Sequence, residues 1–160
     1  MIEYKVMEYL AENNLTISTA ESCTGGMVSA KLINYAGASK SFICGMCTYT
    51  NESKSRLLDI NPDIIETYGA VSTNTAEAMC LGVSRVNGTD IGLATTGIAG
   101  PDGGTAQKPV GLVYIGVAFK GKSYVKELRL KGDRNSIRED SANEVIKMLW
   151  EILMKENNNG

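Results

Sequence analysis

The sequence predicts an α/β domain in which a mixed sheet is covered by helices on both faces. Segments whose apolar residues recur at helical spacing alternate with short segments rich in β-branched residues along most of the chain. The alternation fails once, where two β-rich segments are joined by Lys120-Gly-Lys-Ser123, a sequence typical of a tight antiparallel hairpin. The 160 residues, of which 43% are hydrophobic and 21% charged, suit one globular domain over residues 1–160.

The helices are predicted from apolar periodicity and from residues that start or stop a helix. Gly37 is placed to end the second helix, and Ser72 and Asp133 suit the N-cap positions of the last two. The expected helices cover residues 2–13, 27–36, 52–61 and 63–68, a segment after Ser72 that carries Ala76, Met79, Cys80 and Val83 on one face, and a segment after Asp133 that buries Val145, Leu149 and Ile152 beside Trp150.

The strands are predicted from β-branched and apolar runs bounded by turn residues. They are expected over residues 16–20, 41–50, 90–96, 111–119 and 124–130. Residues 156–160, Glu-Asn-Asn-Asn-Gly, are expected to form a disordered polar tail.

Charge and hydropathy limit the partners. The net charge of −2 argues against a nucleic-acid partner, because non-specific binding to nucleic acid needs a basic face. No apolar segment approaches the roughly 20 residues of a membrane span, so no membrane partner is expected. The first residues lack the charged-then-apolar layout of a signal peptide, and we expect a cytoplasmic protein that binds a small molecule.

The chain contains no histidine. This excludes nucleophile systems that depend on histidine and all histidine metal sites, so a hydrolase would need Lys, Tyr, Asp, Glu or a thiolate as its proton carrier. Cys44 and Cys47 form a C-x-x-C pattern, but residues three apart on a strand point to opposite faces. We therefore expect no metal and no cofactor, and cysteines that act as small core residues.

Ser22 is the first candidate for chemistry. It follows a strand and precedes Thr24-Gly-Gly26, where a helix begins. The first N–H groups of that helix would face it unpaired, ready to hold an anion or an oxyanion. Alternatively, Ser22 or Thr24 is only an N-cap, Cys23 is a rival nucleophile without an evident activator, and Glu21 orients a proton carrier or complements the helix dipole.

A serine nucleophile without histidine needs another base, and lysine is the best candidate. Its pKa must be lowered by burial or by neighbouring positive charge. Lys54 falls in the first turn of a predicted helix, where the dipole disfavours an ammonium. Tyr49, at the end of the preceding strand, could donate a hydrogen bond or relay a proton. Taken alone, Lys54 also fits a solvated surface lysine and Tyr49 a rim residue.

The loop from Thr95 to Gly111 carries four glycines between positions 97 and 104, which allow backbone to approach a ligand closely. It matches neither a P-loop nor a Rossmann fingerprint, and its length favours a functional loop over a flexible turn. Lys108 and Arg134 are candidate phosphate partners, the arginine by its fork and the lysine as a point charge.

Several of these segments together resemble one known family. They are Thr19-Ala-Glu-Ser-Cys-Thr-Gly-Gly26, Tyr49-Thr-Asn-Glu-Ser-Lys54, Gly69-Ala-Val-Ser72, Thr96-Gly-Ile-Ala-Gly-Pro-Asp-Gly-Gly104, Lys108-Pro-Val-Gly111 and Gly132-Asp-Arg134. In this order they resemble the CinA C-terminal domain family, the nicotinamide-nucleotide amidohydrolases, over residues 2–155 and in its stand-alone form.

The resemblance implies a three-layer α/β/α fold with a mixed five-stranded sheet. It also implies hydrolysis of nicotinamide mononucleotide to nicotinic acid mononucleotide and ammonia, with Ser22 as nucleophile assisted by Lys54 and Tyr49. The residues we assign to substrate binding are Glu21, Thr24, Gly25, Gly26, Thr96, Gly97, Gly100, Gly103, Gly104, Lys108 and Arg134. A homodimer is expected from the resemblance alone, and the alternative function is a non-catalytic sensor of pyridine nucleotides or phosphate.

Overall fold

The computed structural model describes all 160 residues and contains one five-stranded sheet. The strands are β1 (Ile17–Glu21), β2 (Phe42–Cys47), β3 (Ile91–Gly97), β4 (Leu112–Phe119) and β5 (Lys122–Arg129), and they lie in the order β2-β1-β3-β4-β5. β1 is parallel to both β2 and β3, whereas β4 is antiparallel to β3 and β5. The sheet is therefore mixed, as the hairpin in the sequence predicts.

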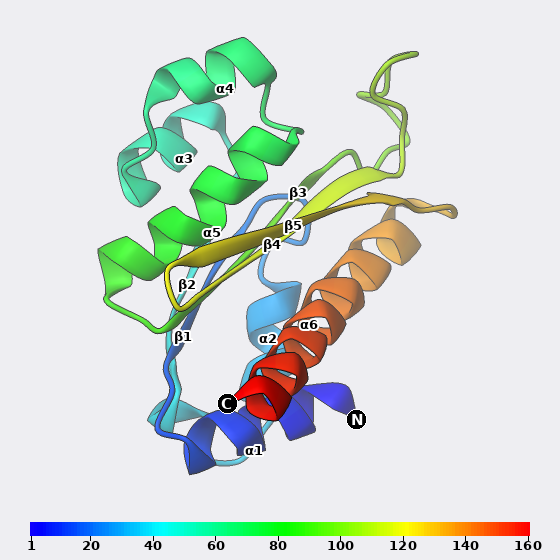
Figure 1. The fold of residues 1–160 in the computed structure, drawn as a ribbon. Coiled ribbons are helices and arrows are strands. Elements are labelled where there is room, and N and C mark those ends of the chain that lie inside the picture. The colour runs from blue at the N-terminus through cyan, green and yellow to red at the C-terminus, as the bar shows by residue number, and fades with distance from the viewer.

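Helices cover both faces of this sheet, which confirms the three-layer α/β/α prediction (Figure 1). One layer contains α1 (Ile2–Glu12), α2 (Met27–Ile33) and the long α6 (Arg134–Asn159). The other contains α3 (Asn51–Leu58), α4 (Pro62–Tyr68) and α5 (Thr73–Asn87), and a short 3-10 helix η1 (Ala38–Lys40) precedes β2. None of the helices combines the length and the apolar character needed to cross a membrane.

The core has two parts, one on each side of the sheet. The larger one includes Leu10, Ile115 and Leu149, which join α1, the sheet and α6. The smaller one lies under α5, around Met79 and Ala94. Strand β3, at the centre of the sheet, has six buried residues in succession, as expected for a strand that is covered on both faces.

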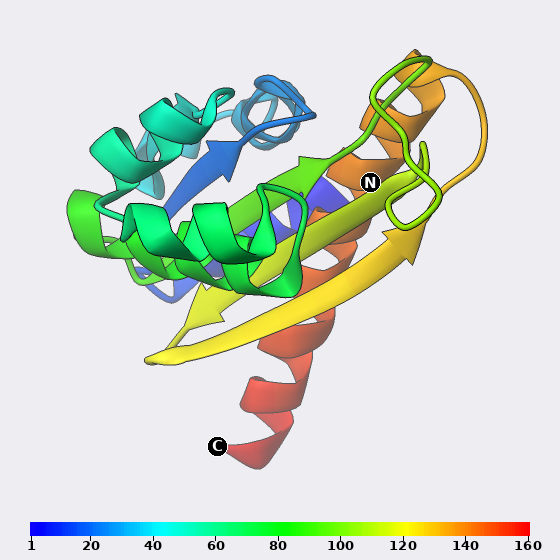
Figure 2. The same ribbon diagram turned by 90° about the horizontal axis from the view of Figure 1, so that it is seen from above.

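The path of the chain creates a crevice at the carboxyl end of β1. From β1 the chain crosses through α2 to β2 on one side, and then through α3, α4 and α5 to β3 on the other side (Figure 2). Open α/β sheets bind ligands at such a switch point, beyond the carboxyl ends of the strands. The loop after β3 and the first turn of α6 reach the same end of the sheet.

The predicted β4–β5 hairpin turn and two predicted N-caps are confirmed. Lys120 and Gly121 both have positive φ in the two-residue turn of the β4–β5 hairpin. The Ser72 and Asp133 side chains accept hydrogen bonds from the third residue of their helices, as N-caps do.

Five expectations were wrong. Helix α3 ends at Leu58 and not at residue 61, and strand β2 ends at Cys47 and not at residue 50, because Thr50 is the N-cap of α3. Helix α2 ends at Ile33 and not at residue 36, and residues 34–37 form turns that connect it to η1. Residues 156–159 continue α6 where a disordered tail was expected, and Glu156 there pairs with Lys120 at 3.5 Å. Cys47 is exposed and not part of the core, because β2 is an edge strand whose alternate residues face outward.

Candidate active site

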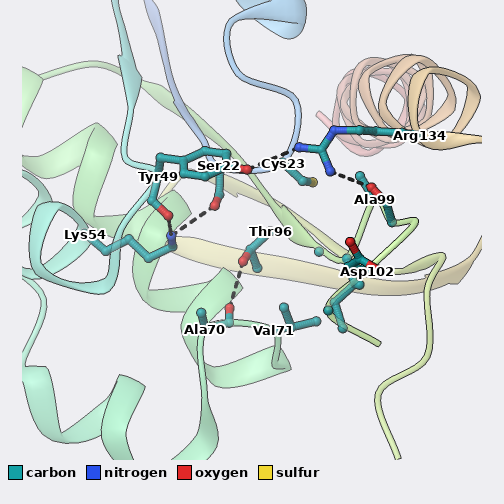
Figure 3. A pocket seen from close by; sticks show the side chains of 14 residues that line it. Ser22, Cys23, Tyr49, Lys54, Ala70, Val71, Thr96, Ala99, Asp102 and Arg134 are labelled. Carbon is teal, nitrogen blue, oxygen red and sulfur yellow. Dashed lines mark hydrogen bonds between the residues drawn. The ribbon is translucent and has the colours of Figure 1, made fainter. Parts of the chain in front are cut away.

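A cavity of about 270 Å³ lies at the carboxyl ends of the three parallel strands (Figure 3). Five segments line it: Ser22 and Cys23 after β1, Tyr49 and Lys54 at the start of α3, Ala70 and Val71 before α5, Thr96 to Gly100 with Asp102 and Gly103 after β3, and Arg134 at the start of α6. The volume is near the lower end of that of small-molecule sites. Segments far apart in the sequence thus meet at the switch point of the sheet.

Ser22 lies in a turn that is held tightly from one side. Its N–H donates to Thr95 O at 3.0 Å, which continues the pairing of β1 with β3. The Glu21 carboxylate, almost fully buried, accepts bonds from the Thr24 hydroxyl at 2.6 Å, from Val28 N at 2.8 Å and from both the N–H and the hydroxyl of Ser29. Glu21 therefore ties the Ser22 turn to the start of α2.

Lys54 is fully buried and reaches Ser22 from α3. Its Nζ lies 3.0 Å from Ser22 Oγ, and it donates to two backbone carbonyls, Thr48 O at 2.8 Å and Tyr49 O at 3.2 Å. Burial lowers the pKa of Lys54 from 10.5 to about 8, and the charge of a Cys23 thiolate would oppose this. Sequence reasoning had assigned the lowering to the helix dipole, whereas the structure assigns it to burial.

Cys23 is the rival nucleophile in the same cavity. Burial raises the pKa of its thiol from 9.0 to about 11, so at neutral pH it is protonated. Because the thiolate is the nucleophilic form of cysteine, the environment of Cys23 does not activate it.

Tyr49 is placed differently from its predicted role. Its ring lines the cavity but is 61% exposed, and its hydroxyl accepts a bond from Arg134 Nη2 at 3.3 Å. No hydrogen bond joins the phenol to Ser22 or to Lys54; only the backbone carbonyl of Tyr49 contacts the lysine. A proton relay through the phenol is therefore not supported by this geometry.

The glycine loop approaches the cavity with its backbone. Arg134 Nη1 donates to Gly100 O at 2.6 Å, so Arg134 links the loop to Tyr49. The N–H groups of Ala99, Gly100, Asp102 and Gly103 donate to no acceptor within the protein. These N–H groups lie on either side of Pro101, and unpaired backbone N–H groups in a loop can bind an anion.

Several residues assigned to substrate binding lie outside the cavity. Thr24 is fully buried and bonds to Glu21 and Thr95, and Lys108 Nζ donates to Tyr68 O at 2.9 Å. The assigned residues that do not line the cavity are Glu21, Thr24, Gly25, Gly26, Gly104 and Lys108. The N–H groups at the start of the helix were expected to hold an oxyanion, but Gly25 N–H is taken by Ser22 O at 3.2 Å. The N–H groups of Cys23 and Thr24 donate to no other residue of the protein.

Sequence reasoning missed part of the wall. Ala70 and Val71 line the cavity, and Ala70 O accepts a bond from the buried Thr96 hydroxyl at 2.8 Å. These two residues lie in the Gly69-Ala-Val-Ser72 motif, which was noted without a role and was the available signal. Asp102 is the only acidic residue of the lining. No group of three or more His, Cys, Asp or Glu residues is arranged to hold a metal ion.

The comparisons with known proteins agree on the family. The family model "CinA C-terminal domain" matches residues 1–153. A putative competence-damage inducible protein of Clostridium novyi is 48% identical over 154 residues, 96% of this chain and 37% of that protein. A CinA-like protein of Dictyoglomus thermophilum is 56% identical over 137 residues, 86% of this chain and 33% of that protein. The chain thus spans about a third of the length of these relatives.

Solved structures have the same fold. The competence/damage inducible protein CihA from Agrobacterium tumefaciens is similar with a TM-score of 0.91 and 36% identity, over 94% of this chain and 92% of that chain. The competence damage-inducible protein A from Klebsiella pneumoniae is similar with a TM-score of 0.92 and 29% identity, over 96% of this chain and 95% of that chain.

Proposed function

The chain belongs to the CinA C-terminal domain family, and from that premise we propose that it hydrolyses the carboxamide of nicotinamide mononucleotide, giving nicotinic acid mononucleotide and ammonia. The nucleophile is Ser22 and the base is Lys54. The proposal is supported by one observation above the others: a buried lysine with a lowered pKa lies within hydrogen-bond distance of a serine in a cavity.

The contacts of Lys54 suit a general base. A neutral amine has two N–H groups and one lone pair, and two carbonyl oxygens, Thr48 O and Tyr49 O, are placed to accept the two N–H groups. The third direction around Nζ leads to Ser22 Oγ at 3.0 Å. With the amine neutral, its lone pair therefore faces the serine hydroxyl and can take its proton.

Acylation then proceeds in two stages. As Lys54 accepts the Ser22 proton, Ser22 Oγ bonds to the carboxamide carbon, and the carbonyl electrons move to its oxygen. The tetrahedral intermediate collapses, the C–N bond breaks, and the Lys54 ammonium returns its proton to the departing ammonia. The product is a nicotinoyl ester of Ser22. The donors that we assign to the oxyanion are the N–H of Cys23, a residue of the cavity wall, and the adjoining N–H of Thr24 behind it.

Deacylation repeats the same proton route with water. Neutral Lys54 takes a proton from water, whose oxygen adds to the ester carbon. When the C–O bond to Ser22 breaks, the lysine returns the proton to Ser22 Oγ. Water and amide are consumed, acid and ammonia are released, and the lysine ends neutral, so the cycle balances without a metal or a cofactor.

The remaining cavity wall suits the nucleotide. We assign the phosphate to the unpaired N–H groups of the glycine loop and to Arg134, which keeps further N–H donors beyond those bound to Gly100 and Tyr49. The Tyr49 ring forms a flat wall for the pyridine, which replaces the proton relay inferred from the sequence.

Ammonia release from nicotinamide mononucleotide tests the function. We expect saturable release by the wild type and loss of release in Lys54→Met, which also controls for a contaminating amidase. Saturable binding of the nucleotide by calorimetry, with no ammonia at high protein concentration, would contradict the proposal and support the sensor alternative.

A further inference from the structure

Arg138 lies on α6, four residues after Arg134, and contacts the turn that follows Ser22. Its Nε donates to Cys23 O at 2.9 Å and its Nη2 to Thr24 O at 3.2 Å. It forms no ion pair with any carboxylate, and its side chain is half-buried. The two backbone carbonyls are therefore its hydrogen-bond partners within the protein.

These contacts fix the orientation of a peptide unit. In a planar trans peptide, the C=O and the N–H of one unit point in opposite directions. Because Arg138 holds Cys23 O toward α6, the N–H of the same unit, which belongs to Thr24, points away from α6. The preceding unit is fixed in the same manner, since Ser22 O accepts a bond from Gly25 N at 3.2 Å and this directs Cys23 N–H the opposite way.

The turn has no other side-chain anchor on that side. Glu21 holds its opposite flank through Thr24, Val28 and Ser29. Gly25 and Gly26, which follow, both have positive φ, and glycine permits more than one backbone conformation. Thr24 O also accepts a bond from Met27 N at 3.1 Å, whereas Cys23 O has no hydrogen-bond partner other than Arg138. Without the guanidinium, the peptide unit after Cys23 would lose its one hydrogen bond to the protein.

We propose that Arg138 is the positioning residue of the oxyanion site: its bond to Cys23 O aims the Thr24 N–H of the same peptide unit and strengthens it as a donor. Its bond to Thr24 O polarises the next unit, whose Gly25 N–H binds Ser22 O and so directs Cys23 N–H. The proposal rests on the acyl transfer by Ser22 described above. A charge-assisted bond to a carbonyl polarises its peptide unit, and such polarisation makes the N–H a better donor. Arg138 acts through the backbone and does not line the cavity.

The test compares two arginines with the same kind of contact. Arg85 Nη2 donates to Leu58 O at 3.2 Å and to Asp59 O at 3.0 Å, at the end of α3 and outside the cavity. Arg138→Gln and Arg85→Gln therefore each remove a guanidinium from two successive backbone carbonyls. Both should lower the melting temperature, but only Arg138→Gln should affect catalysis.

Loss of a whole oxyanion donor lowers kcat about 100- to 1,000-fold. In Arg138→Gln the donors are misaligned and not lost, so we expect kcat to fall about 10- to 100-fold. KM should stay within about threefold of the wild type. Arg138→Lys, which restores the charge and one bond, should recover part of kcat. A kcat of Arg138→Gln equal to that of Arg85→Gln would overturn the proposal, as would a loss that appears in KM alone.

Binding of pyridine-3-boronic acid supplies a second readout, because addition of Ser22 Oγ to boron gives a tetrahedral anion that resembles the intermediate. We expect the dissociation constant to rise in Arg138→Gln by about the factor lost from kcat, and to stay unchanged in Arg85→Gln. If the wild type releases no ammonia from nicotinamide mononucleotide, the proposed function fails, while the boronate affinities still decide the role of Arg138. Equal affinities in the two variants would refute it.

Discussion

The pH dependence of turnover follows from the burial of Lys54. Only the neutral amine can take the proton of Ser22, and burial lowers the pKa of Lys54 to about 8. About 9% of the lysine is then neutral at pH 7 and about 91% at pH 9. We therefore expect kcat/KM for nicotinamide mononucleotide to rise about tenfold over this interval, with a midpoint near pH 8 and a plateau above pH 9.

The assay is initial ammonia release between pH 7 and pH 10 at low substrate concentration. The substrate phosphate, whose second pKa is about 6, has already ionised throughout this range. The Cys23 thiol, with a pKa of about 11, would instead give a rate that keeps rising beyond pH 9. A flat profile, a falling one, or a rise without a plateau would refute the role assigned to Lys54.

Three further predictions concern single side chains. Between about pH 8 and 10.5 the unfolded lysine binds a proton that the folded one does not, so the free energy of unfolding of the wild type should rise with pH relative to that of Lys54→Met. Denaturant titrations in which the two free energies of unfolding change with pH in parallel across this window would contradict the prediction. Glu21→Gln places an amide N–H donor opposite backbone N–H donors, so it should lower the free energy of unfolding, measured by urea titration, by about 2–4 kcal/mol. A change below about 0.5 kcal/mol would show that the carboxylate is not needed for stability. Tyr49→Phe should keep kcat within about threefold, since the phenol contacts only Arg134, and a loss above about 100-fold would restore the proton relay.

Much of the fold was predictable because local signals and tertiary structure agree. The hairpin at Lys120 and Gly121 and the caps at Ser72 and Asp133 follow from patterns of a few residues. The ends of α2 and α6 were predicted less well: α2 ends about one turn earlier than its apolar pattern suggests, and α6 continues through the polar residues 156–159.

The main residues of the site could be predicted from the sequence, but the hydrogen bonds among them could not. The absence of histidine made lysine the best candidate for the base, and the family motif supplied Lys54, but its burial depends on how α3 packs against the turn after β1. For the same reason, nothing in the sequence distinguished the exposed phenol of Tyr49 from a proton relay. Arg138 has the helical spacing that would place it one turn from Arg134, but its two contacts with backbone carbonyls depend on how α6 packs against the turn after β1.

The nucleophile itself is tested most directly by a pair of neighbouring variants, Ser22→Ala and Cys23→Ala, in the ammonia assay at pH 9. Both side chains line the cavity, but only Ser22 is hydrogen-bonded to Lys54. We predict that Ser22→Ala loses at least about 1,000-fold in kcat, while Cys23→Ala stays within about fivefold of the wild type. A Ser22→Ala variant with near-normal kcat, together with an inactive Cys23→Ala, would contradict the account and assign the chemistry to the thiol.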